Sequence, residues 1–303
     1  MSTEYYLAAC MKQAQPRLNT LLRLMFAEAR ALGHPSQWLS SVIGLMRPLG
    51  YGERAIRTAL FRLGEHGELA IERHGRRSVG RLSPTVAASL RAERQRIDTP
   101  PARSFGEAWI MLVNSGGLGA SRYAEARKRL IALDYCQLAP NVLARPAHYR
   151  GAAAEAPEPG LAQFNVDGAQ LAAAVRQPLS GQPDWDLDAA ALQYRTFQQR
   201  FQPLRRLLDL PGAIDDEQAY QIRLLVSHGY QHCRRGDPLL PKELLPADWP
   251  AMAAYQTYMA LLDGCAAQSR RHMLTVIVGS LPDHPIYERI NQRRSIEREA
   301  TVQ

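Results

Sequence analysis

The residues best suited to chemistry in this chain are arginines between positions 52 and 81. In residues 52–63, a period of 3.6 residues per turn places four apolar side chains on one helix face: Ile56, Ala59, Leu60 and Leu63. The opposite face then carries Arg54, Arg57, Thr58, Phe61 and Arg62. Guanidinium groups bind phosphates and guanine edges through paired hydrogen bonds. The pattern therefore predicts a helix that packs through one face and contacts nucleic acid through the other.

A basic hairpin is expected directly after this helix. Residues 69–73 and 78–82 are predicted to be its strands, and Gly75 is suited to the positive φ of a tight turn. The predicted contacts on this hairpin are Arg76, Arg77 and Arg81. A helix with one apolar face beside a basic hairpin is the plan of a winged helix-turn-helix, which places its helix in the major groove of DNA. The predicted partner is double-stranded DNA.

The charge distribution favours the same partner. Residues 1–103 hold 16 basic and 8 acidic side chains, whereas residues 104–303 hold 21 of each, so the net charge of +8 belongs to the first third. Arginines most often lie on a solvated helix face. Solvated arginines would, however, not concentrate the surplus of positive charge in one segment of the chain. DNA contact is therefore the stronger interpretation for Arg54, Arg57 and Arg62, while Thr58 is undecided and His74 is expected at the surface of the turn.

A second group, in residues 228–237, has the spacing of metal ligands. His228 and His232 lie four residues apart, with Cys233 and Asp237 nearby. The metalloprotease pattern requires a glutamate after the first histidine, where this chain has Gly229. A structural role is the preferred interpretation, so no metal or other cofactor is assigned. Because no phosphate-binding glycine loop or nucleophile motif occurs either, the sequence predicts that the protein is not an enzyme.

Composition sets the remaining bounds. With 46% hydrophobic and 22% charged residues, the chain resembles an ordinary soluble protein, and no apolar run reaches the roughly 20 residues needed to cross a bilayer. No membrane partner is expected. The four cysteines are scattered and form no Cys-x-x-Cys pair, which is typical of reduced thiols in a cytoplasmic protein.

The predicted architecture is α+β and multidomain. The first domain, residues 1–98, contains a helix over 16–31, a second helix that starts after Pro35 with Ser36 as its N-cap, the basic helix, the hairpin and a connecting helix over 84–97. Residues 104–180 alternate strand, helix, strand and strand, which predicts a small ferredoxin-like sandwich. Residues 185–303 are predicted to be helical, with one long helix from about residue 251. In the helix predicted over residues 188–209, the expected core positions are Leu192, Phe197, Phe201, Leu204 and Leu208.

Three stretches of the chain resemble the PaaX family of bacterial transcriptional repressors. The first is residues 53–63 (ERAIRTALFRL) with 75–78 (GRRS) and 81–84 (RLSP). The second is Trp109 followed by residues 138–146 (LAPNVLARP). The third is residues 228–230 (HGY), 237–241 (DPLLP) and 244–250 (LLPADWP). The resemblance implies a homodimer with an N-terminal winged helix-turn-helix, a ferredoxin-like (Cas2-like) middle domain and a helical C-terminal domain.

The resemblance also implies a regulator with a small-molecule signal. Family members repress operons for the breakdown of aromatic acids such as phenylacetate, and aryl-CoA esters such as phenylacetyl-CoA release them from the operator. Such a ligand needs an apolar slot for its ring and cations for its phosphates. The candidate cations are Arg122, Arg127, Arg129, Arg145 and Arg150. Each of these arginines taken alone is more commonly solvated.

The chain departs from the family pattern at the DNA-contacting helix. Phe61 stands where a small polar residue is usual, and either touches a thymine methyl group or packs under the hairpin.

The alternative function is a Cas2-like, metal-dependent nuclease or another DNA-processing enzyme. That function needs an aspartate after the first strand of the middle domain, where this chain has Asn114, a poor ligand for a divalent cation. A nuclease is therefore the less favoured hypothesis.

Overall fold

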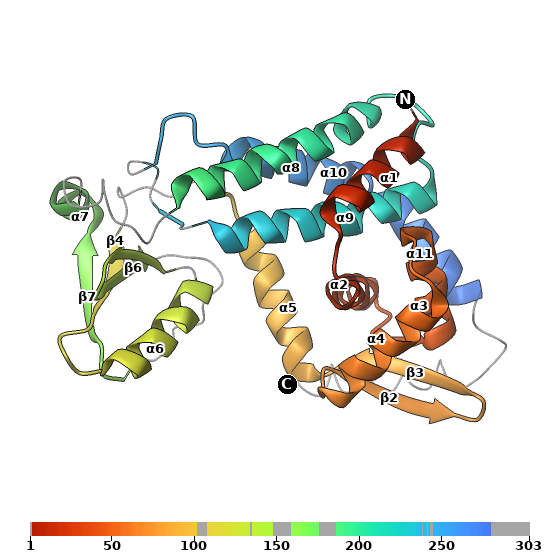
Figure 1. The fold of residues 1–303 in the computed structure, drawn as a ribbon, viewed down its shortest axis with the longest axis horizontal. Coiled ribbons are helices and arrows are strands. Elements are labelled where there is room, and N and C mark those ends of the chain that lie inside the picture. The colour runs from red at the N-terminus through yellow and green to blue at the C-terminus, as the bar shows by residue number, and fades with distance from the viewer. Residues whose placement is uncertain are drawn as a thin grey trace, which may run out of the picture. The chain divides into compact units, whose positions relative to one another are not determined.

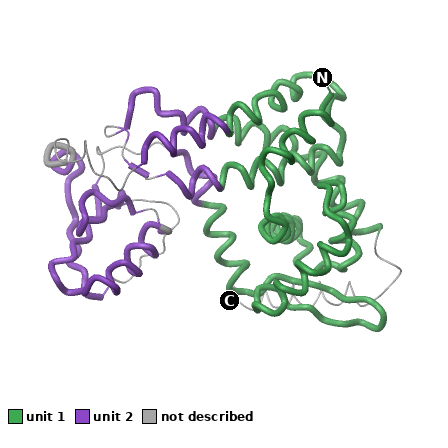
Figure 2. Tube along the Cα trace, viewed as in Figure 1, with its two compact units in different colours: residues 1–95, 197–231, 256–303 green, residues 96–196, 232–255 purple. Residues whose placement is uncertain are grey.

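The computed structural model describes residues 2–101, 108–133, 135–147, 159–175, 186–237, 239–240, 242 and 245–279. Figure 1 shows a mixed architecture in which helices predominate and two small sheets are present. The chain divides into two compact units, which are coloured in Figure 2. Unit 1 contains residues 1–95, 197–231 and 256–303, and unit 2 contains residues 96–196 and 232–255. Neither unit is one continuous stretch of chain.

The N-terminal part of unit 1 contains the predicted helices and hairpin. Its elements are α1 (Thr3–Ala14), α2 (Leu18–Ala31), β1 (Ser36–Trp38), α3 (Leu39–Met46), the 3-10 turn η1 (Arg47–Leu49), α4 (Glu53–Glu65), β2 (Leu69–His74), β3 (Arg77–Leu82) and α5 (Pro84–Ile97). The strands form an antiparallel sheet in the order β1-β3-β2. The predicted helices over 16–31 and 84–97 are confirmed. Helix α1 lies outside the predicted elements.

The core of this part is formed by the apolar stripes of three helices. The fully buried side chains come from α2, α3 and α4, and include Leu21, Leu22, Met25, Val42, Met46, Ile56 and Leu60. Periodicity of 3.6 residues places each set on one helix face. The three helices therefore pack around a shared core, which leaves the opposite face of α4 at the surface.

The predicted start of the second helix is wrong. Ser36 does not cap a helix but lies in β1, where it pairs with Arg81 of β3. The helix begins three residues later, at Leu39. Pro35-Ser36 is a local pattern typical of a helix start, but the backbone of β1 gains its hydrogen bonds from a strand far along the chain. The pairing also fixes Trp38 opposite Val79 of the hairpin.

The described residues of the C-terminal part, 186–279 with short gaps, contain four helices. These are α8 (Leu187–Leu207), α9 (Asp216–Gly236), α10 (Ala251–Gly264) and α11 (Ala266–Gly279). The single long helix predicted from residue 251 is thus interrupted at Cys265. Asp215 and Gln218 cap α9 reciprocally, because each side chain accepts a hydrogen bond from the other's backbone amide.

One predicted core position in these helices is wrong. Leu192 is 64% exposed, whereas Phe197, Phe201 and Leu204 are buried as predicted and Leu208 is half-buried. In unit 1, the ring of Phe197 packs beside Phe201, and Tyr230 of α9 stacks on Tyr258 of α10 with centroids 4.3 Å apart. Leu192 is displaced by five residues from Phe197, which places it off the stripe that these aromatic side chains occupy.

Within unit 1, the C-terminal helices pack against the N-terminal elements. Gly44 of α3 approaches α11 so closely that a Cβ atom at position 44 would lie 3.1 Å from Val276. The side chain of Gln221 in α9 donates a hydrogen bond to the carbonyl of Pro48. The elements that hold α4 are therefore themselves supported by the C-terminal helices.

Unit 2 contains a four-stranded antiparallel sheet. Its elements are β4 (Ala108–Val113), α6 (Ala120–Ala132), β5 (Cys136–Ala139), β6 (Val142–Pro146), β7 (Ala162–Asp167) and α7 (Gly168–Val175), and the strand order is β5-β6-β4-β7. Strand β4 lies inside the sheet, as its apolar sequence predicts, and pairs with β6 and β7. Strands β5 and β6 follow each other along the chain and pair as an antiparallel hairpin.

Both faces of this sheet are apolar. One face packs against α6, where Leu112 and Leu143 meet Tyr123 and Leu130. The other face is built around Trp109, which is fully buried in a cluster that includes Leu240 from the segment after α9. That segment is therefore part of the core of unit 2. In the described part of the chain, no helix combines the length and apolar character needed to span a membrane.

Candidate nucleic-acid interface

Helix α4 has two faces of opposite character. Its four apolar residues are buried, as predicted: Ile56, Ala59, Leu60 and Leu63. The five residues predicted to contact DNA are all exposed: Arg54, Arg57, Thr58, Phe61 and Arg62. The helix thus presents a continuous polar and aromatic surface while its other face is held in the core.

Two side chains on the exposed face of α4 are held within the helix. Arg57 forms an ion pair with Glu53 one turn earlier, with a guanidinium nitrogen 2.7 Å from a carboxylate oxygen. Thr58 donates its hydroxyl proton to the carbonyl oxygen of Arg54 across 2.9 Å. Phe61 is 63% exposed, so it does not pack under the hairpin. Of the two placements considered for this ring, only the exposed one agrees with the structure.

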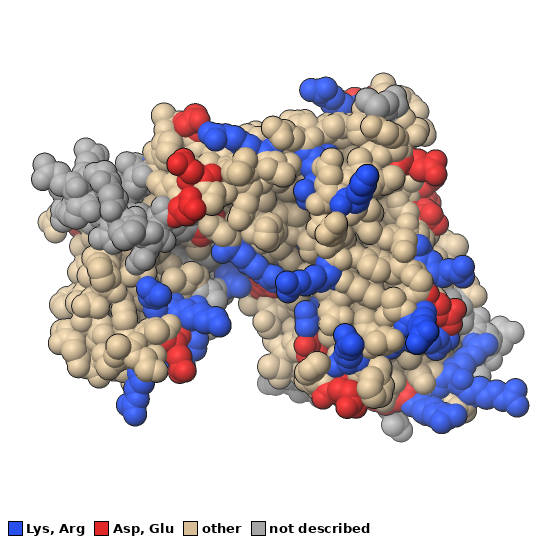
Figure 3. All heavy atoms as spheres, viewed as in Figure 1, with Lys and Arg blue, Asp and Glu red and all other residues tan. Residues whose placement is uncertain are grey.

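The hairpin is longer than predicted by one residue on each side. His74 pairs with Arg77, so the turn consists of Gly75 and Arg76, and Gly75 has the predicted positive φ of 62°. Arg76 and Arg77 are exposed, and Figure 3 shows Lys and Arg side chains projecting at the end of the β2–β3 hairpin. The tip of the hairpin is therefore basic, as the sequence predicts.

The hairpin arginines differ in their contacts. The guanidinium carbon of Arg77 lies 6.0 Å from the ring centroid of Trp38, a cation–π arrangement on the buried side of β1. Arg81 is half-buried and lies 3.4 Å from a carboxylate oxygen of Glu72. Arg73, which was not among the predicted residues, donates to the carbonyl of Gly75 across 3.1 Å and adds another exposed cation. Its position near the end of a predicted strand, two residues before Gly75, was the available signal.

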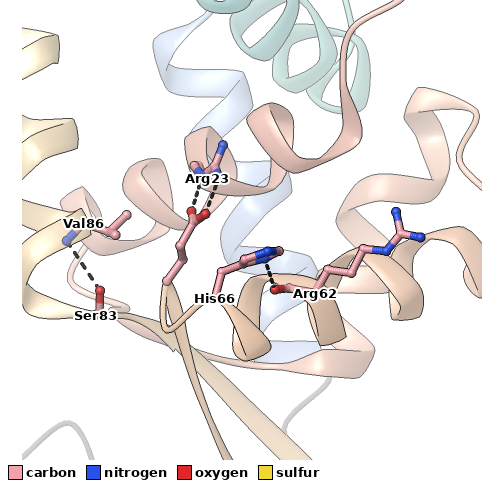
Figure 4. A network of polar contacts seen from close by, with 6 residues as sticks. Arg23, Arg62, His66, Ser83 and Val86 are labelled. Atoms are coloured by element: carbon pink, nitrogen blue, oxygen red, sulfur yellow. Dashed lines mark hydrogen bonds and ion pairs between the residues drawn. The ribbon is translucent and has the colours of Figure 1, made fainter.

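An ion pair fixes the base of the hairpin to α2. Two nitrogens of the Arg23 guanidinium lie 2.5 and 2.7 Å from the carboxylate oxygens of Glu68, and Figure 4 marks both contacts at Arg23. These hydrogen bonds from Arg23 hold the pKa of Glu68 below its usual range. The carbonyl of Glu68 accepts from the amide of Ser83, whose hydroxyl accepts from Val86 at the start of α5. Ser83 thus supplies a capping hydroxyl at the start of α5.

A largely buried carboxylate, that of Glu28, connects α2 to the C-terminal helices of unit 1. Glu28 accepts from Arg94 of α5 at 2.8 Å and from Arg223 of α9 at 3.0 Å. Arg223 also donates to the carbonyl of Leu262 in α10. Burial alone raises the pKa of Glu28, but the positive charges and hydrogen bonds of Arg223 and Arg94 outweigh it and lower the pKa below its usual value. Glu28 is therefore a charged carboxylate that forms an ionic network with Arg94 and Arg223.

The arginines predicted to bind an effector are not gathered in one place. Arg122 and Arg129 are exposed and lie two turns apart on α6. Arg127 is half-buried and donates to Gln137 on β5. Arg145 is 6% exposed, donates to the carbonyl of Leu133 and lies over the ring of Tyr135 at 4.5 Å. These contacts fit a packing role for Arg145. Arg150 lies outside the described residues.

The residues weighed for metal chemistry have other contacts. Asp237 is buried and accepts from the hydroxyl of Tyr194 at 2.6 Å, while His232 is exposed. Among the residues that the structure describes, no group of three or more His, Cys, Asp or Glu is placed to hold a metal ion. Asn114 shapes the loop after β4, since its amide donates to the carbonyl of Leu118 and its oxygen accepts from two backbone amides. All four cysteines are buried free thiols.

Comparisons with known proteins agree with this organisation. The chain matches the family described as PaaX-like protein over residues 22–86, and the PaaX-like protein C-terminal domain over residues 185–275. The first match contains α4 and the hairpin, and the second contains α8, α9 and α10. Of the three stretches that resemble the PaaX family, the first and the third thus lie within these two matches.

One curated relative is described as transcriptional repressor PaaX of Escherichia coli (strain K12). It is 35% identical over 227 residues, which cover 72% of this chain and 71% of that protein. Among solved structures, the uncharacterized protein Rv0674 from Mycobacterium tuberculosis is similar with a TM-score of 0.47 and 23% identity, covering 77% of this chain and 90% of that chain.

These matches define the class of the protein as a regulator and not an enzyme, because the curated relative is a transcriptional repressor. The chain belongs to the PaaX family.

Proposed function

We propose that this chain is a transcriptional repressor that binds duplex DNA through α4 and the β2–β3 hairpin. The observation that carries the proposal is the two-faced character of α4: four apolar side chains anchor it in the core, and three arginines lie on its exposed face. A second group of exposed arginines lies at the tip of the adjacent hairpin. Cations on two neighbouring elements are the footprint expected for a protein that contacts a groove and its phosphates.

The fold of the N-terminal part is, in this proposal, a winged helix-turn-helix. Helices α2, α3 and α4 form its body, α4 is the helix that enters the major groove, and β2 and β3 form the wing. Two internal contacts support a fixed wing: the pairing of β1 with β3 and the ion pair between Arg23 and Glu68. We assign residues 1–98 to this domain, 104–180 to the middle domain and 185–303 to the helical domain.

The middle domain is assigned to the ferredoxin-like (Cas2-like) class. Its four strands are β4, β5, β6 and β7 in chain order. In the sheet they lie in the order β5-β6-β4-β7, so the first strand of the chain lies between the third and the fourth. A helix follows the first strand, and all pairs are antiparallel. This order is the one that a split β-α-β arrangement produces. A nuclease function has no support, since Asn114 is engaged with the loop backbone.

DNA binding is tested by mobility-shift titration. The full-length chain is used to select duplexes from a random library, and the selected duplex is compared with a scrambled one. The proposal expects tighter binding of the selected duplex and a steep loss of affinity with salt, because phosphate contacts release counterions. Equal binding of both duplexes would overturn it.

We further infer that the active form is a homodimer on a two-fold operator of an aromatic-acid catabolic operon, and that an aryl-CoA ester releases it. Family membership is the support for this step. In unit 2, Arg122 and Arg129 supply exposed cations suited to the phosphates of coenzyme A. Such a ligand can release DNA only if it binds the low-affinity conformation more tightly than the DNA-bound one.

The effector is tested by a thermal-shift panel of aryl- and acyl-CoA esters beside their free acids. One thioester, with phenylacetyl-CoA as the first candidate, is expected to raise the melting temperature and to release the selected duplex. The variant Arg122→Ala/Arg129→Ala should need a higher concentration of that ester. If no thioester changes either quantity, the proposed effector class is wrong, while the DNA-binding proposal stands on its own titration.

A further inference from the structure

The exposed face of α4 is not uniformly basic. Positions 54, 58, 61 and 65 follow one another along a single face of a helix, opposite the buried stripe. Arg54 begins this line, Glu65 ends it, and its centre is occupied by Thr58 and Phe61. The middle of the surface proposed to contact DNA is therefore apolar, with Arg57 and Arg62 beside it.

The polar groups near this centre are already engaged. The hydroxyl proton of Thr58 is directed at the carbonyl of Arg54, which leaves its methyl group and an acceptor lone pair for a partner. The guanidinium of Arg57 is held one turn away by Glu53. Neither contact covers the ring of Phe61, which is 63% exposed. A partner that meets this centre thus encounters a ring and a methyl group before it encounters a charge.

An exposed phenylalanine forgoes the stabilisation that burial of its side chain brings, which makes its position opposite the core stripe informative. The major groove of duplex DNA displays one apolar group among its hydrogen-bonding groups, the C5-methyl of thymine. Cations around an apolar centre match a methyl group flanked by phosphates and guanine edges. A protein partner would satisfy the ring but would not explain the surrounding arginines.

We propose that Phe61, supported by Thr58, is a specificity-determining residue that recognises the methyl group of a thymine near the centre of each half-site. This inference rests on the proposed function, namely that α4 lies in the major groove. It assigns the flanking arginines to phosphates and guanine, and the ring to the one base that carries a methyl group in that groove. Discrimination then comes from burial of apolar surface and not only from hydrogen bonds.

The first experiment compares selection from a random duplex library by the wild-type chain, Phe61→Ala and Phe61→Leu. The wild type is expected to select a thymine at one fixed position in each half-site. Phe61→Ala should lose the preference at that position alone, and Phe61→Leu should retain part of it. Because Phe61 is exposed, the melting temperature of the variants should match the wild type. A thymine preference that persists unchanged in Phe61→Ala overturns the inference.

The second experiment replaces each thymine of the selected duplex by uracil, one at a time, which removes only the methyl group. At the position that Phe61 contacts, wild-type affinity should fall about fourfold, since one buried methyl group contributes roughly 0.8 kcal/mol. Phe61→Ala should show no such loss. The matched control is Leu192→Ala, which removes another exposed apolar side chain, 64% exposed, and should keep the full uracil effect.

The outcomes separate this inference from the function on which it rests. If the wild type binds the selected duplex but no uracil substitution weakens binding, the thymine contact is wrong and DNA binding stands. If the wild type selects no sequence and binds no duplex above a scrambled control, both are wrong.

Discussion

Arg223 in α9 donates a hydrogen bond to Glu28 in α2, with the two atoms 3.0 Å apart. The pair joins residues from distant parts of the chain inside one compact unit. Both side chains are largely buried, at 13% and 17% exposure, so the interaction is screened by solvent far less than a surface ion pair. The ion pair links α2, which packs against α4, to the C-terminal helices, so its loss is expected to lower the stability of unit 1.

Replacement of Arg223 by Met should destabilise unit 1 by about 3 kcal/mol, because removing one partner of a buried pair leaves the other charge poorly compensated. Arg94 remains to hold Glu28 and limits the loss. The measurement is urea unfolding followed by circular dichroism. The matched control is Arg205→Met on the exposed surface of α8, which should change stability by no more than about 0.5 kcal/mol. Equal effects of the two substitutions would contradict a role for the buried network.

The same carboxylate predicts a pH dependence. The pKa of Glu28 is lower in the folded state, so its contribution to stability is fully present above the pKa of an unfolded glutamate, about 4.3, and is lost as pH falls through the lower folded value. Glu28→Gln should therefore melt at a lower temperature than the wild type at pH 7. The two melting temperatures should converge in acid, where the wild-type carboxyl is protonated. A difference that stays constant down to pH 3 would show that charge on Glu28 is not the cause.

Leu240 should contribute to the core of unit 2 although it lies far from the sheet in sequence. It is 1% exposed and belongs to the same cluster as Trp109. Leu240→Ala should cost about 2–4 kcal/mol, since truncation removes buried apolar surface and leaves a cavity. Leu192→Ala, at an exposed position of α8, should cost about 0.5 kcal/mol or less. Thermal unfolding of both variants decides whether the segment after α9 completes this core.

The two arginines at the hairpin tip should differ in their effects. Arg76→Ala is expected to lower affinity for all duplexes and to reduce the slope of log affinity against log salt by about 0.9, the value for one phosphate contact. Its melting temperature should stay unchanged, because Arg76 is exposed in the turn. Arg77→Ala should also lower the melting temperature, because it removes the packing of the guanidinium on Trp38. Unfolding curves that coincide for the two variants would contradict this division.

Local sequence patterns are sufficient to predict α4 and the hairpin that follows it. The buried stripe of α4 repeats with the helical period, and the turn at Gly75 carries its own local signal, so both could be predicted from adjacent residues. Strand β1 could not, because Ser36 resembles a helix cap until its pairing with Arg81 is known. Leu192 is apolar but lies on a different face of α8 from Phe197 and Phe201, so its residue type alone does not predict burial.

The charged network illustrates what local patterns omit. Nothing near Glu28 in the sequence distinguishes it from a solvated glutamate on α2, and its partners Arg94 and Arg223 lie on other helices. For the same reason the predicted effector arginines could not be sorted beforehand. Arg145 is one of the five candidate effector-binding cations, yet its guanidinium lies over the ring of Tyr135 inside the fold. Burial of a charge depends on tertiary packing, which spacing along the chain does not encode.

The discontinuous composition of the two compact units has a consequence for the order in which the protein folds during synthesis. Unit 1 includes residues from 256 onward, and unit 2 includes residues 232–255. A continuous N-terminal domain can complete its contacts as soon as it leaves the ribosome, but here Glu28 of α2 gains its contact with Arg223, and Trp109 its cluster with Leu240, only after those residues have been made. Until then, the apolar face of β4 is open to solvent. We expect nascent chains halted before residue 232 to remain sensitive to protease and to bind chaperones, and the finished chain to close both cores late, after most of it has been made.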